Sequence, residues 1–207
     1  MRAYSSHKDI IKLVDKVDSV GLVPTMGSLH EGHLSLVRKA LIKNEKVIVS
    51  IYVNPMQFDD SSDLKKYPRN IKNDLQKLES FSDIFVYAPD DNDIYEKQEK
   101  KKKYNFGQFT KIMEGKIRPG HFDGVATIVE KLLRMFTPSD AYFGEKDYQQ
   151  LILIKTLVKE LKLKVNINGC KTIREDDGLA MSSRNKLLNI EERKIAKNII
   201  RLLKKAK

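Results

Sequence analysis

The stretch Gly21–Ala40, GLVPTMGSLHEGHLSLVRKA, combines features that structure alone does not require. It begins as an apolar strand, places His30 and His33 around a glycine, and continues as an amphipathic helix. Ligands of open α/β sheets bind in loops at the carboxyl ends of strands. Gly27 and Gly32 lack side chains, so a ligand can approach the backbone there. The stretch therefore predicts a ligand site between a strand and the following helix.

The two histidines favour an anionic ligand. His30 and His33 are about one helical turn apart, so both project from the same side at the start of the helix. That helix end offers unpaired N–H groups and a positive dipole to a phosphate. Two imidazoles can also donate hydrogen bonds to a phosphoryl group as its charge grows. The alternatives are a pair of surface histidines and a metal site, for which no third ligand is obvious nearby.

Strand and helix patterns alternate along the chain, as in a doubly wound parallel α/β sheet. Apolar residues recur at helical spacing in segments 9–17, 32–43, 71–78, 124–136 and 148–161. Short apolar or β-branched runs predict strands at 20–24, 46–53, 83–89, 140–144 and 164–168. The lysine-rich segment 90–110 is expected to form a loop excursion.

Composition excludes several classes of protein. A chain of 207 residues fits one α/β domain with a small addition. It has no apolar run near the about 18 residues of a membrane span, and charged residues interrupt the apolar positions of segment 1–17, unlike a signal peptide. We therefore expect a cytoplasmic protein. Cys170 is the only cysteine, which excludes internal disulfides and a cysteine zinc cluster and favours a buried apolar role.

The net charge of +11 makes nucleic-acid binding an alternative. Nine of these charges lie in two segments, 96–103 with a net charge of +3 and 185–207 with +6. Lysine runs without interleaved aromatic residues are typical of solvated loops and tails. We therefore expect neither a nucleic-acid partner nor a membrane partner.

Six motifs in order carry a resemblance to a known family. HEGH resembles the H-x-G-H signature of adenylyl-transferring nucleotidyltransferases, and the longer VPTMGSLHEGHLSLV is similar to the pantothenate synthetase (pantoate–β-alanine ligase) family. The other matching segments are VNPMQF (53–58), YPR (67–69), RPGHFDGV (118–125), FGEKDYQQL (143–151) and DGLAMSSRN (177–185). The resemblance implies a Rossmann-like, nucleotidyltransferase-type doubly wound sheet and a homodimer.

The resemblance also implies a reaction. The family condenses (R)-pantoate with β-alanine for coenzyme A biosynthesis, through a pantoyl adenylate, and releases AMP and pyrophosphate. ATP is then a substrate accompanied by Mg²⁺, and no tightly bound organic cofactor is expected. A carboxylate with a pKa near about 4 needs no general base, so positioning and charge stabilisation supply the catalysis. A nucleotidyltransferase that acts on another acid is the alternative enzyme.

The resemblance assigns ATP binding to three motifs and one further residue. The residues are Met26, Gly27, Ser28, Leu29, His30, Glu31, Gly32 and His33; Gly144, Glu145, Lys146 and Asp147; Ile173; and Met181, Ser182, Ser183 and Arg184. Two hydroxyls and a guanidinium in the last motif suit pyrophosphate. Without the resemblance, this motif would be an ordinary helix cap.

Catalytic roles follow from the same motifs. The resemblance makes His33 a proton donor, assisted at the phosphates by His30, Lys146 and Arg184. The amides of Gln57 and Gln150 would bind pantoate and β-alanine. Alternatively, Gln57 is a polar residue that closes a turn at the end of a strand, and Gln150 is an exposed residue in the first turn of a helix. Arg118 and His121 would close over the site.

Two features depart from the family. Two acidic residues often follow YPR, but here Asn73 precedes Asp74, so Asp74 alone is the predicted magnesium contact. Relatives usually continue into a C-terminal lid domain, whereas 23 residues follow Arg184. We expect residues 1–184 to form the catalytic domain and 185–207 only the start of a lid, with an uncovered amphipathic helix from Glu191. Adenylation would then be slow, because water is poorly excluded.

Overall fold

A parallel sheet organises the chain, in a computed structural model that describes residues 1–95 and 99–206. The strand order is β1-β4-β3-β2-β5-β6, and every pairing is parallel. The strands are β1 (Ala3–Tyr4), β2 (Val20–Thr25), β3 (Lys46–Ile51), β4 (Ile84–Tyr87), β5 (Asp140–Gly144) and β6 (Asn166–Cys170). The predicted doubly wound α/β sheet is confirmed.

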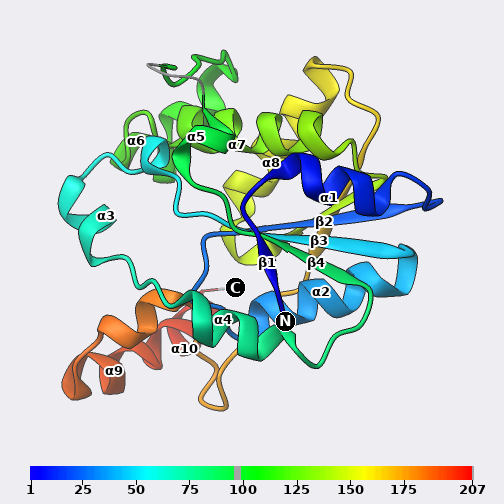
Figure 1. Ribbon diagram of the computed structural model, residues 1–207. Helices are drawn as coiled ribbons and strands as arrows, with labels where there is room; N and C mark the ends of the chain where they lie inside the picture. Colours follow the sequence, from blue (N-terminus) through cyan, green and yellow to red (C-terminus); the bar gives the residue numbers. More distant parts are fainter. Residues whose placement is uncertain (96–98, 207) are drawn as a thin grey trace.

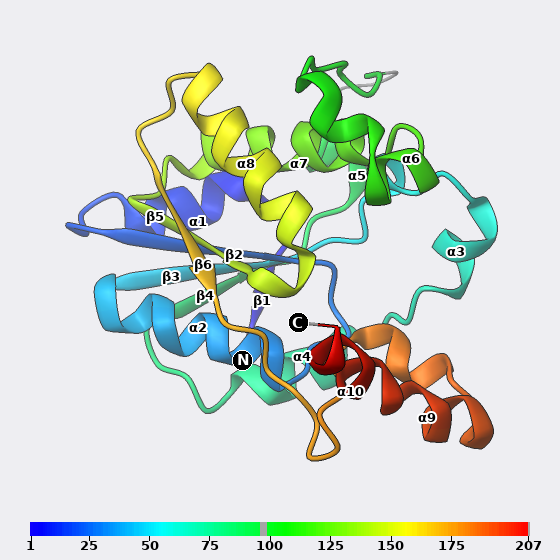
Figure 2. The same cartoon turned by 180° about the vertical axis from the view of Figure 1, so that it is seen from behind.

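Helices form a layer on each face of the sheet. The α-helices are α1 (His7–Val14), α2 (Glu31–Lys43), α3 (Ser61–Lys66), α4 (Ile71–Leu78), α5 (Asp91–Ile94), α6 (Met113–Ile117), α7 (His121–Phe136), α8 (Tyr148–Glu160), α9 (Ile190–Ala196) and α10 (Asn198–Lys205). The 3₁₀ helices are η1 (Pro55–Gln57), η2 (Gly107–Lys111), η3 (Glu145–Asp147) and η4 (Ser183–Leu187). Helices α1, α7 and α8 cover one face and α2 and α4 the other (Figure 1). Seen from behind, α9 and α10 lie on the side of α2 and α4 (Figure 2).

Each face of the sheet has its own apolar core. Leu22 and Ile48 belong to the cluster formed with α7 and α8. Val23, Val47 and Val49 belong to the cluster formed with α2 and α4. Successive side chains of a strand point to opposite faces, so a strand that is covered on both sides needs a continuous apolar run. This double burial explains the apolar stretches of the sequence.

The strand order changes direction at β2. The chain passes from β2 through α2 to its neighbour β3 and on to β4, and it then returns to place β5 on the other side of β2. The loops leaving β2 and β5 therefore diverge, and ligands of such sheets bind in the crevice between them. The topology places a binding site at the carboxyl ends of β2, β3 and β5.

Several details differ from the predictions. The short strand β1 and helices α3 and α5 were not expected, and β6 begins two residues later because its register with β5 pairs Asp140 with Asn166. The helix predicted from Glu191 is two helices, α9 and α10, whose apolar side chains at Ile195 and Ile199 are over half exposed. The lysine run 96–103 lies partly outside the described residues, and the division of the chain after residue 184 stays a prediction.

The described residues contain no helix with both the length and the apolar character of a bilayer span.

Helix α7 approaches η1 at the level of the backbone. A Cβ on Gly124 would overlap the carbonyl oxygen of Met56 and the Cα of Gln57. Neither atom is the end of a flexible side chain, so only glycine permits this approach. Gly124 thereby fixes the distance between α7 and the turn that carries Gln57.

We expect Gly124→Ala to lower the free energy of unfolding by about 1–3 kcal/mol, since the overlap forces a backbone shift. Gly144→Ala is the matched control, because its Cβ meets nothing within 4 Å and its φ is −74°. The control should stay within about 0.5 kcal/mol of wild type in urea unfolding. Equal stability of the two variants would show that η1 can shift away from α7 without a loss of stability.

Candidate functional site

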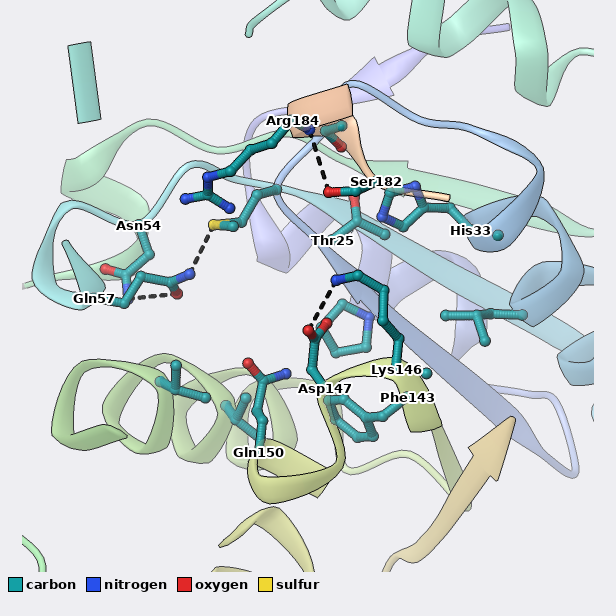
Figure 3. A pocket seen from close by; sticks show the side chains of 18 of the residues that line it. Thr25, His33, Asn54, Gln57, Phe143, Lys146, Asp147, Gln150, Ser182 and Arg184 are labelled. Atoms are coloured by element: carbon teal, nitrogen blue, oxygen red, sulfur yellow. Dashed lines mark hydrogen bonds and ion pairs between the residues drawn. The ribbon is translucent and has the colours of Figure 1, made fainter. Parts of the chain in front are cut away.

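A cavity lies at the carboxyl ends of β2, β3 and β5, between the loop after β2, η1, the start of α7, the start of α8 and segment 171–184 (Figure 3). Many of the predicted residues line it together. They are Met26, His30, Gly32, His33, Gln57, Arg118, His121, Gly144, Lys146, Asp147, Gln150, Ile173, Met181, Ser182, Ser183 and Arg184. Motifs that are far apart in the sequence therefore meet at one place.

Some predicted ATP-binding residues lie behind the cavity wall or outside it. Gly27, Ser28, Leu29, Glu31 and Glu145 are not among its lining residues. Gly27 and Ser28 form a turn in the loop after β2, with φ values of 78° and 51°. Leu29, the next residue, is completely buried. The carboxylate of Glu31 pairs with Arg38 at 2.9 Å. These residues shape the loop and the helix that carry the histidines.

Asp74 lies beneath this loop. Its Oδ2 accepts from the Ser28 N–H at 2.8 Å and its Oδ1 from the Leu29 N–H at 2.7 Å, while the residue is 1% exposed. It does not line the cavity, and its hydrogen bonds hold the loop. Its predicted contact with magnesium stays a prediction. Among the described residues, no group of three or more His, Cys, Asp or Glu side chains could hold a metal ion.

The two histidines close the first turn of α2. Nδ1 of His30 accepts from the Gly32 N–H at 3.1 Å, and Nδ1 of His33 accepts from the His30 N–H at 3.3 Å. A ring nitrogen that accepts carries no proton, so the proton of each neutral ring is on Nε2. Both imidazoles thus retain an N–H donor for a ligand.

The environment keeps both rings neutral. Burial, with smaller contributions from Lys146, Lys77 and Lys186, lowers the pKa of His30 to about 4. Burial, then His30, Lys146 and Lys77, lower the pKa of His33 to about 3. Neutral rings donate hydrogen bonds but supply no proton as an acid at about pH 7. In the unliganded chain His33 is therefore a hydrogen-bond donor, and its predicted role as a proton donor stays a prediction.

Positive side chains surround the histidines. Lys146 pairs with Asp147 at 2.9 Å, and Arg184 pairs with Asp63 at 2.8 Å. Lys186 donates to the Ser28 hydroxyl at 3.4 Å. Sequence reasoning missed Lys186 because it belongs to a run that reads as a solvated tail. Together with the N-terminus of α2, these cations suit a ligand with several negative charges.

Carboxamides project into the same cavity from another side. Figure 3 shows Gln57 of η1 and Gln150 of α8 directed toward the space next to Lys146. The Gln57 Oε1 accepts from Asn54 at 3.3 Å. Asn54 also lines the cavity, although no pattern in the sequence singled it out. Neutral amides suit a hydroxyl or a carboxylate of a small organic acid.

Arg118 and His121 support this side of the cavity. Nδ1 of His121 donates to the carbonyl oxygen of Gln57 at 2.7 Å, and Nε2 accepts from Arg118 at 3.1 Å. Burial lowers the pKa of His121, in keeping with a neutral ring. His121 therefore anchors η1, and its predicted role in closing over the site stays a prediction.

Residues 1–207 match the family described as pantoate-beta-alanine ligase. The chain belongs to this family of ligases. The pantothenate synthetase of Christiangramia forsetii is 47% identical over 100% of this chain and 75% of its own length. That of Flavobacterium psychrophilum is 49% identical over 91% of this chain and 67% of its own. The chain thus spans two thirds to three quarters of these ligase sequences.

Solved structures of the family share the fold. The pantothenate synthetase of Thermus thermophilus aligns with a TM-score of 0.92 and 42% identity, over 97% of this chain and 72% of that chain. The pantoate-beta-alanine ligase of Francisella tularensis, complexed with beta-gamma ATP and beta-alanine, aligns with a TM-score of 0.92 and 41% identity, over 99% of this chain and 79% of that chain.

The histidine tautomers can be tested directly. In proton–nitrogen correlation spectra at about pH 7, we expect His30 and His33 to be neutral with the proton on Nε2. Their folded pKa values lie below the unfolded value, so the unfolded chain binds more protons between about pH 4 and 6.5. These rings should therefore lower stability as the pH falls through that window. Titration of both rings near pH 6.5 would contradict the assignment.

Asp74→Ala should reduce the free energy of unfolding by about 2–3 kcal/mol, because two buried N–H groups lose a charged acceptor. Asp63→Ala is the control, since it removes a partly exposed carboxylate paired with Arg184 and should change stability by less than about 1 kcal/mol. Urea unfolding at neutral pH measures both. Similar losses would show that the loop does not depend on Asp74.

Proposed function

We propose that this chain carries the adenylate-forming site of a pantoate–β-alanine ligase. It uses ATP to activate the carboxylate of (R)-pantoate and transfers the pantoyl group to β-alanine. The observation that carries the proposal is one cavity in which His30, His33 and Lys146 meet Gln57 and Gln150. The donors and the cation suit phosphates, and the two amides suit a hydroxy acid.

The first step needs positioning more than acid–base chemistry. The pantoate carboxylate attacks the α-phosphorus, a new O–P bond forms, and the bond between the α-phosphorus and the bridging oxygen breaks. Pyrophosphate leaves with the electron pair, and no proton moves. Lys146, the Nε2–H groups of His30 and His33 and the N-terminus of α2 stabilise the charge on the phosphoryl oxygens.

The second step forms the amide bond. The free amine of β-alanine attacks the acyl carbon of the adenylate, AMP leaves, and the nitrogen releases a proton. Gln57 is well placed to orient first pantoate and then β-alanine, because its side chain is held at the cavity wall. Amines react only when unprotonated, so this step favours higher pH than the first.

The segment of Ser182, Ser183 and Arg184 faces the leaving pyrophosphate in this proposal. Ser183 donates to the Ser28 carbonyl at 3.1 Å, which ties the segment to the loop after β2. The guanidinium of Arg184 now pairs with Asp63, and the same planar donors suit phosphate oxygens. Phosphate binding would replace that ion pair.

Magnesium is proposed only as part of the nucleotide substrate. Asp74 accepts from backbone N–H groups and Asp63 pairs with Arg184, so the proposal assigns neither carboxylate to the metal. Magnesium commonly keeps its waters and binds mainly through substrate phosphates. The homodimer that the family resemblance implies also stays a prediction.

Pantoate-dependent exchange of pyrophosphate into ATP tests the proposal. We expect exchange with pantoate and none without it. His33→Ala should lower the exchange rate at least about tenfold, which equals roughly 1.4 kcal/mol of transition-state stabilisation. His7→Ala is the control, because His7 lies in α1 and pairs with Asp93.

Exchange that requires a different acid would favour the nucleotidyltransferase alternative. A loss smaller than tenfold in His33→Ala would reduce His33 to a residue that positions the loop. Equal losses in His7→Ala and His33→Ala would point to a general effect on folding.

A further inference from the structure

Asn54 is a buried side chain with every hydrogen-bonding group in use. It is 1% exposed and begins η1 at the end of β3. Its Oδ1 accepts from the Met56 N–H at 3.2 Å and from the Tyr95 hydroxyl at 2.7 Å. Its Nδ2 donates to the Gly124 carbonyl at 3.1 Å and to Gln57 Oε1 at 3.3 Å. A side-chain amide offers two acceptor and two donor sites, and all four are filled.

This arrangement fixes the orientation of the Gln57 amide. The Met56 N–H can only donate and the Gly124 carbonyl can only accept, so the Asn54 amide cannot be reversed without two repulsive contacts. Its Nδ2 therefore faces Gln57, whose oxygen accepts the bond. The Gln57 Nε2 faces the cavity, where one of its two N–H groups donates to the Met26 sulfur at 2.7 Å and the other is left for a ligand. Gln57 thus presents a donor and not an acceptor.

Tyr95 reaches this network from outside the cavity. It follows α5, and its side chain is 9% exposed but does not line the cavity. Its ring lies 6.3 Å from that of Tyr52, whose hydroxyl donates to Asp91 at 2.7 Å and so holds α5 against the end of β3. Burial raises the pKa of Tyr95, so its hydroxyl keeps its proton. The hydroxyl is thus a fixed donor behind Asn54.

We propose that Tyr95 is a positioning residue that, through Asn54, holds the Gln57 amide with its N–H group toward the acid substrate. The proposal rests on the proposed function for the identity of that acid. Removal of the Tyr95 hydroxyl leaves one lone pair of a completely buried Asn54 oxygen without a donor. Asn54 then loses its fixed position, and Gln57 can turn its oxygen toward the cavity. A donor in that position suits the oxygens of a hydroxy acid, whereas an amide oxygen repels a carboxylate.

Tyr95→Phe tests the proposal, with Tyr104→Phe as the matched control. Tyr104 also loses a partly buried hydroxyl, but that group donates to Glu130 at 2.7 Å, away from Asn54. In the exchange reaction, we expect Tyr95→Phe to raise the KM for pantoate roughly five- to tenfold, as expected for one unsatisfied buried group. The KM for ATP should stay unchanged, and Tyr104→Phe should alter neither.

A double-mutant cycle with Gln57→Ala separates positioning from a general structural effect. If Tyr95 acts through Gln57, adding Tyr95→Phe to Gln57→Ala changes the KM for pantoate by less than about twofold. Additive effects, equal changes in both KM values, or an unchanged KM for pantoate would each overturn the proposal.

A second readout does not depend on turnover. The side-chain amide resonances of Asn54 and Gln57 should shift in Tyr95→Phe and remain in place in Tyr104→Phe. If the wild-type chain shows no pantoate-dependent exchange, the proposed function fails, and these spectra alone decide the role of Tyr95. Unshifted Gln57 resonances in Tyr95→Phe would overturn the proposed positioning even when exchange is normal.

Discussion

The buried carboxylate of Asp74, which accepts from two consecutive backbone N–H groups, is the contact on which the phosphate side of the cavity depends. The loop after β2 contains two residues with positive φ, and one of them, Ser28, is not glycine. Such a backbone is unfavourable unless its surroundings hold it. The carboxylate of Asp74 holds this backbone through two short hydrogen bonds. Helix α2 begins two residues after Leu29, the second of the two donors. Asp74 thereby sets where the helix dipole and both histidines point.

On the side of the cavity that faces the proposed organic acid, a buried polar side chain again fixes its neighbours through hydrogen bonds. Asn54 is buried and satisfied at all four hydrogen-bonding positions, and Gly124 lets α7 come close enough to supply one of them. A polar group that is completely satisfied away from the ligand has one stable orientation. The cavity therefore has defined donors on both sides before any ligand arrives, and binding does not have to order them.

The sequence predicted the framework well because periodicity reports burial, and the histidine and glutamine residues of the site lie in recognisable motifs. The sequence did not predict contacts between residues that are far apart in the chain, or elements that have no periodicity of their own. The hydrogen bonds of Asp74 could not be predicted, because nothing local shows that its partners are N–H groups 45 and 46 residues earlier. Tyr95 lies in a polar segment that reads as a loop. The strand β1 has two residues and pairs only with β4, so it has no periodicity of its own. The apolar period continues across Lys197, which hides the break between α9 and α10.

The lysines around the histidines serve two purposes that act together. They attract phosphates, and by repelling an imidazolium they help to lower the pKa values of His30 and His33. A bound polyphosphate offsets the charge of these lysines, which removes the smaller cause of the shift. The larger cause, burial, increases when the ligand excludes water from the rings. The two changes oppose each other, and burial is the larger cause of the lowered pKa values in the unliganded chain. Attack by a carboxylate that is already ionised, with pyrophosphate as the leaving anion, requires fixed donors and cations and no acid.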